Sequence, residues 1–381
     1  MPLGLFSRRG PVRVQPFFGY RSTDRLHVSA RAVRAPEAVF ESSGFWRGFA
    51  TMLGEYASHE EPGLSAELEY RCGDGPVRRQ RAVSGPEGFM HFELDLGEGS
   101  ERGARTCWET ALVRWTCPDD PDAMREAVAH ILTPGEQTRI GVISDIDDTI
   151  LETGITGNVR AIARNWKRVM AQMPSEREAV PGASDFYAAI GGASAGPGQP
   201  GRIAGDQSTV SRVRPVFYVS SSPWNLFSYL VSFKRHSGLP LGPVMLRDWG
   251  FNRETLGSEG HGSHKRDAVM QILQSFPKMR FALIGDDSQK DLEVFGAIAS
   301  EHPDRIAAVF IRSVSDEPSS EREIAARSAI EAADVPFWTG NDYVAAHRFL
   351  TANGLDFEAG VDRLVRTASE GDAPGPANAS A

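Results

Sequence analysis

The chain has 381 residues, more than a usual single domain, and this length favours about two domains, each with its own core. Hydrophobic residues make up 41% and charged residues 24%, as in ordinary soluble globular proteins, and the longest apolar runs have only strand length, which excludes a transmembrane segment. The net charge of -9 disfavours a nucleic-acid-binding protein, because such a protein needs a positive surface to displace counterions from phosphates.

Two features bear on the compartment. Met1 to Tyr20 has no continuous apolar segment and no small-residue cleavage pattern, so it does not resemble a secretory signal, and we expect a cytoplasmic protein. Cys72, Cys107 and Cys117 are odd in number and lack C-x-x-C spacing, which argues against a disulfide framework and a zinc site. We expect them to be reduced thiols.

The amino-terminal end is rich in arginine. Between Arg8 and Arg34 the only acid is Asp24. Solvated arginines on strands are the simpler interpretation of this segment. The alternative is peripheral contact with an anionic membrane surface, such as lipid headgroups.

Residues 12 to 116 contain short segments of alternating apolar and polar side chains, among them AELEYRC and GFMHFELDL, which turn-rich pieces such as CGDGP separate. Short alternating strands with frequent turns predict a small all-β sandwich domain, which we assign to residues 1–120. Residues 121–137 form an acidic stretch with prolines and one short helical pattern, and we expect a linker there.

Beyond residue 138 the character of the chain changes. Apolar strands such as IGVIS, PVFYVS and RFALIG alternate with helical patterns up to about residue 350, which predicts an α/β domain with a mostly parallel, doubly wound sheet. Ligands bind such sheets beyond the carboxyl ends of the strands. Residues 191–212 are rich in Gly, Pro and Ser and are expected to be a flexible insertion, and residues 351–381 a C-terminal segment with a disordered tail.

Acidic residues follow the apolar strand IGVIS in the pattern D-x-D-x-T, which comprises Asp145, Asp147 and Thr149, with Asp148 between them. A carboxylate is a competent nucleophile toward phosphorus, because hydrolysis then proceeds through formation and breakdown of an acyl phosphate, and Asp145 fits this role. A carboxyl two residues on points the same way in an extended segment, so Asp147 can protonate the leaving alkoxide and then deprotonate the attacking water. The alternative interpretation is a solvated acidic turn.

Hydroxyl groups and a lysine are predicted at the same edge of the sheet. The strand PVFYVS ends in Ser220, Ser221 and Ser222, where hydrogen-bond donors can bind a phosphoryl oxygen; we assign Ser220 to catalysis, and Ser221, Ser222 and Thr149 to substrate binding. A helix cap is the alternative for this Ser-Ser-Pro sequence. Lys265, at a predicted helix start, gains nothing from the helix dipole, and a nearby anion would explain it. We assign it to hold the charges of the nucleophile and the phosphoryl group together.

The strand RFALIG ends in Asp286 and Asp287, and Asp291 follows one helical turn later. Mg²⁺ takes few carboxylates and keeps water and phosphate oxygens in its remaining positions. We therefore predict a Mg²⁺ site in which Asp286 joins the Asp145 carboxylate and the Asp147 backbone carbonyl, while Asp287 or Asp291 binds through water or orients its neighbours. Each acid alone could be a surface group after a strand, and the shared sheet edge is what favours a site.

These residues resemble the four motifs of the haloacid dehalogenase (HAD) superfamily, which are D-x-D-x-T, a strand-end Ser or Thr, a Lys and an acidic G-D pattern. Longer phrases, SDIDDTILETG, FYVSSSPWNLF, GPVMLRDWG and GSHKRDAVMQILQSFPKMRFALIGDDSQKD, are similar to the catalytic family of the actin-patch-associated phosphatidate phosphatases. The resemblance spans about Val142 to Asp291. It implies a HAD-like, Rossmann-like sheet and a Mg²⁺-dependent phosphatidate phosphatase that releases diacylglycerol and phosphate. Asp287 and Leu292 depart from the family pattern G-D-S-G-Q-x-D-P-E, which concerns the outer metal ligands and not the nucleophile.

Three hypotheses remain open from the residues. The first is the phosphatidate phosphatase with an aspartyl-phosphate intermediate. The second keeps this mechanism for a soluble phosphate ester, because the catalytic residues contact only the phosphoryl group. The third is a non-enzymatic module, either a phosphoacceptor receiver domain or an inactive HAD-fold scaffold. Asp147 argues against a receiver, and the presence of Asp145, Lys265 and Asp286 argues against a scaffold.

Overall fold

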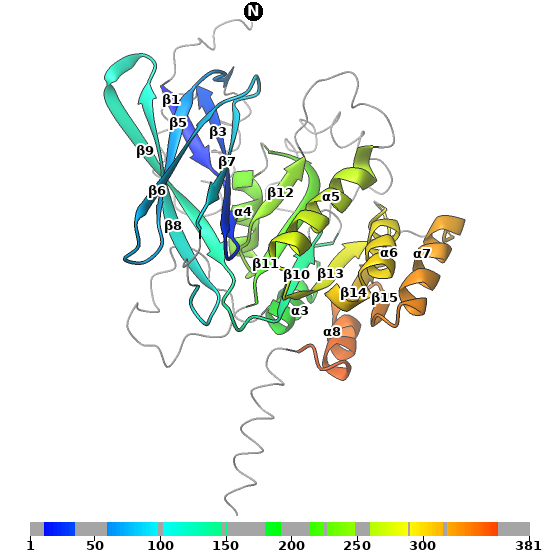
Figure 1. Cartoon of the computed structure of the whole chain (residues 1–381). Coiled ribbons are helices and arrows are strands. Elements are labelled where there is room, and N and C mark those ends of the chain that lie inside the picture. The colour runs from blue at the N-terminus through cyan, green and yellow to red at the C-terminus, as the bar shows by residue number, and fades with distance from the viewer. Residues whose placement is uncertain are drawn as a thin grey trace, which may run out of the picture.

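The computed structural model describes residues 11–34, 59–97, 102–146, 149–150, 180–191, 214–224, 227–247, 260–288, 290–314 and 318–356, and the statements below refer to them. These residues form two β-sheets, one mostly antiparallel with nine strands and one parallel with six, and the described helices follow the first strand of the six-stranded sheet (Figure 1). The chain therefore combines an antiparallel β part with a later α/β part.

The nine-stranded sheet uses the first part of the chain. Its strands pair antiparallel except for β2 and β9, which are parallel. In β5 the side chains alternate as the sequence predicts, because Ala66, Leu68 and Tyr70 are buried while Glu67 and Glu69 point outward. The strands are β1 Val12–Pro16, β2 Gly19–Arg21, β3 Arg25–Arg34, β4 His59–Glu60, β5 Ser65–Arg71, β6 Val77–Val83, β7 Phe89–Asp95, β8 Cys107–Cys117 and β9 Asp120–Thr133.

Strand β9 corrects one expectation. The sequence predicts a linker with a helical pattern over residues 121–137, but β9 occupies Asp120–Thr133 and pairs with β8 along its length. Ala129 and Ile131 face the core, whereas Val128 is half exposed, so the burial follows a strand period. A short apolar run such as AVAHIL fits helix and strand periods alike, and the neighbouring strand decides between them.

The six-stranded sheet has the order β12-β11-β10-β13-β14-β15, and its neighbouring strands are parallel. Strands β10, β13 and β14 are largely continuous apolar runs, as expected for strands that are covered on both faces. The strands are β10 Ile140–Ser144, β11 Val216–Pro223, β12 Val244–Arg247, β13 Arg280–Asp286, β14 Ile306–Arg312 and β15 Phe337–Gly340. The helices are α3 Ala183–Gly191, α4 Phe227–His236, α5 Gly260–Ser275, α6 Asp291–Glu301, α7 Glu321–Ala332 and α8 Tyr343–Ala352, with a short 3₁₀ helix at Pro303–Arg305.

Helices cover both faces of this sheet. One buried cluster joins the sheet to α3, α4 and α8, through residues such as Phe186, Leu230 and Leu350. A second cluster joins the opposite face to α5, α6 and α7, through residues such as Ile272 and Ile298. This two-sided packing leaves the carboxyl edge of the strands as the place where polar side chains can gather.

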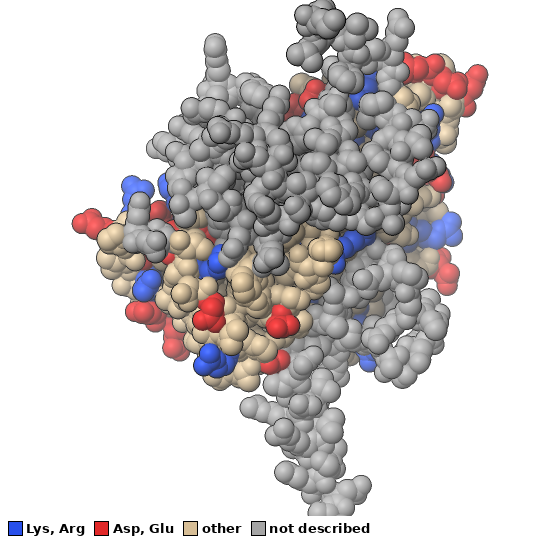
Figure 2. Space-filling model, turned by 180° about the vertical axis from the view of Figure 1, so that it is seen from behind, with Lys and Arg blue, Asp and Glu red and all other residues tan. Residues whose placement is uncertain are grey.

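Four arginines of the amino-terminal strands have acidic partners. The shortest contacts are 3.0 Å for Arg21 with Glu109, 3.1 Å for Arg31 with Glu60, and 2.6 Å for Arg34 with Glu61 and Asp119, and Arg25 pairs with Glu93. Acidic and basic side chains are likewise interspersed over the described part of the face in Figure 2. The excess of arginine in this segment is therefore offset by acids from elsewhere in the sheet. The three cysteines are free thiols.

Candidate functional site

The candidate site lies at the carboxyl ends of three adjacent strands. Asp145 follows β10, Ser220 lies near the end of β11, and Asp286 ends β13. Because β10 is the strand between β11 and β13, these residues from distant parts of the chain meet at one edge. All three are buried.

An acidic triad with a lysine forms the centre of the site. Carboxylate oxygens of Asp145, Asp286 and Asp291 all lie within 4.8 Å of one another. The ammonium group of Lys265 lies 2.8 Å from Asp145 Oδ1 and donates a hydrogen bond to Asp291 Oδ1. Lys265 itself is only 2% exposed, so these charges interact with little screening by water.

The pKa values of this cluster show how the charges depend on one another. Burial by itself lowers the pKa of Lys265, but the carboxylates of Asp145, Asp291 and Asp286 outweigh burial and hold the pKa well above its ordinary value. Burial raises the pKa of Asp291 to about 6, and Asp286 acts in the same direction while Lys265 opposes it. The lysine is therefore fixed in its charged form, whereas burial and the neighbouring Asp286 both disfavour the ionised form of Asp291.

Thr149 and Ser288 hold the carboxylates in place. The Thr149 hydroxyl lies 3.1 Å from Asp286 Oδ2 and 3.3 Å from Asp145 Oδ2, and its single proton can be donated to one of them at a time. Ser288 donates to Asp286 Oδ1 from both its backbone N–H, at 2.6 Å, and its hydroxyl, at 2.5 Å. These donors orient the Asp286 carboxylate within the triad.

Two tyrosines support the segment from Ser144 to Thr149, and sequence reasoning missed both. Ser144 Oγ donates to the Asp145 carbonyl oxygen at 2.6 Å and lies 2.5 Å from the Tyr187 hydroxyl, on α3. The Tyr343 hydroxyl, on α8, donates to the Thr149 carbonyl oxygen at 2.7 Å. Both tyrosines lie in ordinary helical patterns, so the sequence carries no signal of this role beyond their apolar spacing.

Gly285 is needed for the approach of α6 to β13. A Cβ atom at this position would lie 2.5 Å from Asp291 Oδ2 and 2.7 Å from Asp291 Cβ, closer than real Cβ contacts. The absence of a side chain therefore lets Asp291, the first residue of α6, enter the cluster. Asp291 Oδ2 also accepts a hydrogen bond from the Asp286 N–H at 3.4 Å.

The remaining predicted residues take different positions. Asp287 Oδ1 accepts a hydrogen bond from the Val314 N–H at 2.8 Å, which ties it to the end of β14, and it is not part of the triad. Lys265 lies within the second turn of α5 rather than at its first residue. Asp147, Asp148 and the side chains of Ser221 and Ser222 lie outside the described residues. The same holds for residues 192–212, which are nearly all of the expected insertion.

A divalent cation fits the donors of this cluster. Among the described residues, three buried carboxylates lie around the ammonium group of Lys265, and a cluster of buried negative charge is stabilised by added positive charge. Carboxylate oxygens at the separation of this triad can share a hard cation, since Mg²⁺ and Ca²⁺ both prefer oxygen ligands. The triad could therefore hold a divalent metal ion.

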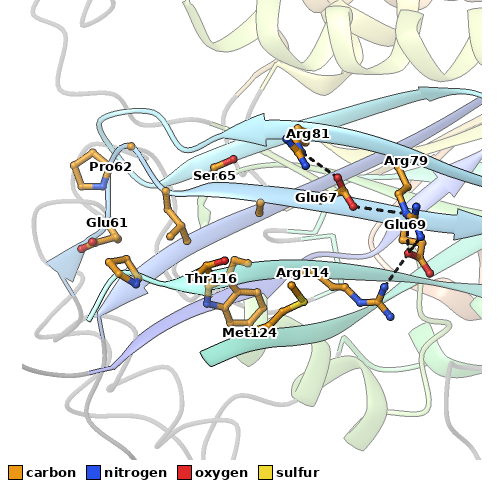
Figure 3. Close-up of a pocket in the computed structure, with 15 residues that line it drawn as sticks. Glu61, Pro62, Ser65, Glu67, Glu69, Arg79, Arg81, Arg114, Thr116 and Met124 are labelled. Carbon is orange, nitrogen blue, oxygen red and sulfur yellow. Dashed lines mark hydrogen bonds and ion pairs between the residues drawn. The ribbon is translucent and has the colours of Figure 1, made fainter. Parts of the chain in front are cut away.

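A separate hollow of about 490 Å³ lies on the nine-stranded sheet, and none of its lining residues belongs to the six-stranded sheet (Figure 3). Glu67 and Glu69 of β5 point toward Arg79 and Arg81 of β6 and Arg114 of β8. The Arg81–Glu67 and Arg114–Glu69 pairs measure 3.0 and 2.8 Å. Because these charges pair across the strands, they stabilise the sheet rather than mark a ligand site.

No helix in the described part of the chain is long and apolar enough to cross a bilayer.

Comparison with known proteins adds to this geometry. Residues 140–313 match the family model of the catalytic domain of phosphatidate phosphatase APP1. The chain is 31% identical over 191 residues to phosphatidate phosphatase APP1 of Saccharomyces cerevisiae, which covers 49% of this chain and 28% of the relative. It is 26% identical over 180 residues to an uncharacterized protein of Schizosaccharomyces pombe, which covers 47% of this chain and 26% of the relative. The chain thus spans about a quarter of the length of these relatives.

Among solved structures, a β-glucuronidase of Bifidobacterium dentium aligns with a TM-score of 0.22 at 10% identity, over 87% of this chain and 60% of that chain. This likeness is too slight to bear on fold or function. The matched residues 140–313 begin at β10 and end just after β14, so they contain the whole acidic triad and Lys265.

Proposed function

Because residues 140–313 match the family model of the phosphatidate phosphatase APP1 catalytic domain, we propose that this chain is a Mg²⁺-dependent phosphatase with a HAD-like, doubly wound catalytic sheet. We propose phosphatidate as its substrate, with diacylglycerol and phosphate as products. The similarity to the yeast enzyme supports this choice of substrate. The proposed location is the cytoplasm, with action at the membrane surface where such a lipid lies.

The observation that carries the proposal is the buried contact of Lys265 with Asp145 inside a cluster of acids at the carboxyl edge of the sheet. Ligands of such sheets bind beyond the strand ends, which is the edge where Asp145 lies. Lys265 keeps Asp145 ionised and offsets the charge of an incoming phosphoryl group, so the two anions can approach each other. Asp145 is therefore the proposed nucleophile.

In the proposed reaction a carboxylate oxygen of Asp145 attacks phosphorus and the bond from phosphorus to the ester oxygen breaks. The leaving alkoxide takes a proton from Asp147, which gives the diacylglycerol hydroxyl. Asp147 then accepts a proton from water as the water oxygen attacks the phosphorus of the aspartyl phosphate. Phosphate leaves and the Asp145 carboxylate is restored.

Asp145 and Asp286, with the backbone carbonyl of Asp147, are the proposed direct ligands of Mg²⁺. When bound, the ion offsets charge on the phosphoryl oxygens. Asp291 acts mainly through Lys265, with which it forms an ion pair and from which it accepts a hydrogen bond. Ser220, Ser221, Ser222 and Thr149 are the proposed donors to the phosphate.

The test is phosphate release by the purified full chain, with and without Mg²⁺, from phosphatidate in vesicles and from a panel of soluble phosphate esters. Release that needs Mg²⁺ and prefers phosphatidate is expected. Asp145→Asn should abolish it, whereas Asp185→Asn, an exposed acid in the first turn of α3, should not change it.

A phosphorylated peptide containing Asp145 should be found by mass spectrometry of acid-quenched wild-type protein. Absence of phosphate release from every ester would reject the enzyme. Preference for a soluble ester over phosphatidate would reject the lipid substrate and keep the mechanism.

A further inference from the structure

Aromatic side chains of the nine-stranded sheet pack against the segment that follows β11. Phe17 lies between β1 and β2, Phe89 begins β7, and both contact Trp224, which directly follows the last residue of β11. We call Phe17, Phe89 and Trp224 the aromatic brace. The brace lies where the nine-stranded sheet meets the α/β part of the chain, since Phe17 also contacts Phe227, the first residue of α4.

The contacts of the brace are close and largely buried. The ring centroids of Phe17 and Trp224 are 4.3 Å apart, and those of Phe89 and Trp224 are 5.4 Å apart. Phe17 and Phe89 belong to the same buried cluster as α3, α4 and α8, although they come from the other sheet. Arg31 packs its guanidinium over the Phe89 ring, 4.9 Å from the centroid, which adds a further contact to this ring.

Trp224 stands at one end of an irregular segment. The pairing of β11 with β12 advances from Ser220 opposite Leu246 to Pro223 opposite Arg247, so Ser221 and Ser222 leave the regular ladder. Ser220 is fully buried in the sheet and fixes the first end of this bulge. Trp224, held by the brace, fixes the second end. A bulge held at both ends has little freedom to change the direction of its backbone N–H groups.

The start of α4 is held by the same part of the chain. Phe227, its first residue, lies 4.7 Å from Phe17 and 5.4 Å from Phe18, measured between ring centroids. Gln15 Nε2 donates to Ser228 Oγ at 2.9 Å. The nine-stranded sheet and the residues that connect its strands therefore contact both Trp224 and Phe227.

We propose that the aromatic brace positions the Ser220–Ser222 segment for phosphoryl binding. The nine-stranded sheet then contributes to the geometry of the active site and is more than an attached domain. This inference rests on the proposed phosphatase function. The brace residues are positioning residues, since they act through the backbone of the serine segment. Small displacements of groups that orient a reacting phosphate have large effects on rate, which is why contacts outside the reaction centre can matter.

The same interface offers a matched control. Tyr20 is also buried between the two parts of the chain, but it packs against Phe217 and Phe276, at 5.7 and 6.0 Å between ring centroids, and accepts a hydrogen bond from Gln271 of α5. It does not belong to the brace. Tyr20→Leu therefore removes an aromatic ring from the interface without removing a contact to Trp224.

The experiment compares Phe17→Leu and Phe89→Leu with Tyr20→Leu in the full chain. It measures kcat and KM for p-nitrophenyl phosphate, the inhibition constant of inorganic phosphate, and the urea midpoint of each variant. Both brace variants are expected to lose about tenfold in kcat and to bind inorganic phosphate about tenfold more weakly. Tyr20→Leu should keep both values near wild type, and Phe17→Tyr, which retains the ring, should restore them.

Wild-type kcat and phosphate inhibition in both brace variants would overturn the proposal, and so would an equal loss in Tyr20→Leu. If Phe17→Leu does not fold, Phe89→Leu decides by the same criteria. If the wild-type chain releases no phosphate from any ester, the phosphatase function fails, and calorimetric binding of inorganic phosphate with Mg²⁺ then tests the brace. Weaker binding by the brace variants than by Tyr20→Leu would support it, and equal binding, or none by the wild type, would overturn it.

Discussion

Lys234 of α4 provides a stability prediction that is independent of catalysis. Its side chain is fully buried, and it has no hydrogen-bond partner in the part of the chain that the structure describes. The ammonium nitrogen lies 3.7 Å from the centroid of the Tyr218 ring, whose hydroxyl donates instead to the Pro240 carbonyl oxygen at 2.7 Å. Burial lowers the pKa of Lys234 from 10.5 to about 7.

The sign of the pH effect follows from proton binding. Between about pH 7 and 10.5 the unfolded chain holds a proton on this lysine that the folded chain has lost, so the unfolding free energy rises with pH across this window. As the pH falls from 10.5 this stability is lost progressively, and the loss is complete once the pH has fallen through the folded pKa of about 7. At about 1.4 kcal/mol per pH unit, burial of Lys234 costs about 4 kcal/mol near pH 7. Methionine has a similar length and no charge, so Lys234→Met should gain about 2–4 kcal/mol there, less the lost contact with the ring.

Urea unfolding followed by tryptophan fluorescence, near pH 7 and near pH 10, measures this difference. The gain of Lys234→Met over wild type should be largest near pH 7 and should shrink toward pH 10. Lys278→Met, at an exposed position, is the control and should stay within about 0.5 kcal/mol of wild type at both pH values. A less stable Lys234→Met at pH 7, or a gain that does not depend on pH, would refute the reasoning.

Three further predictions concern the acidic triad and one helix. Mg²⁺ at about a hundredfold excess over its Kd should stabilise the fold by about 2.7 kcal/mol in differential scanning fluorimetry, and Asp286→Asn should remove most of this gain; an undiminished gain would mean that the ion binds elsewhere. Gly285→Ala places a Cβ against Asp291, so both kcat and the stabilisation by Mg²⁺ should fall. Wild-type values for both would contradict the role given to Gly285. Ser320→Ala removes the capping box at the start of α7 and should lower the unfolding free energy by about 1 kcal/mol with kcat unchanged; no change in urea midpoint would refute it.

Four strands of the six-stranded sheet, β10, β11, β13 and β14, could be predicted because each contains a continuous apolar run, as strands buried on both faces do. The short strands β12 and β15, of four residues each, were not predicted. The order of the strands could not be predicted, since no local pattern states that β10 lies between β11 and β13. Strand β9 was missed for a related reason. Its apolar residues suit two periods, and only pairing with β8 selects the strand.

Motif spacing singled out Asp145, Lys265 and Asp286, and these residues lie in one buried cluster. Spacing could not separate Asp287 from Asp291, because both follow the same strand at short distances. Their contacts depend on where α6 begins and on how closely it approaches β13. Asp291 is the first residue of α6 and reaches Lys265, whereas Asp287 bonds to the chain beyond β14.

The arrangement around Asp145 explains how a cluster of mutually repelling acids can keep one geometry. From one face of the sheet, Lys265 of α5 approaches Asp145 and supplies the charge that opposes repulsion. From the other face, Tyr187 of α3 bonds to the Ser144 hydroxyl and Tyr343 of α8 donates to the Thr149 carbonyl oxygen. Repulsion among carboxylates would otherwise displace the residue with the weakest support, and displacement of Asp145, the proposed nucleophile, would lower the rate. Because this segment is supported from both faces, the repulsion among the carboxylates acts on their side chains and the backbone of Asp145 stays in place. Lys265 and a bound cation can offset that repulsion.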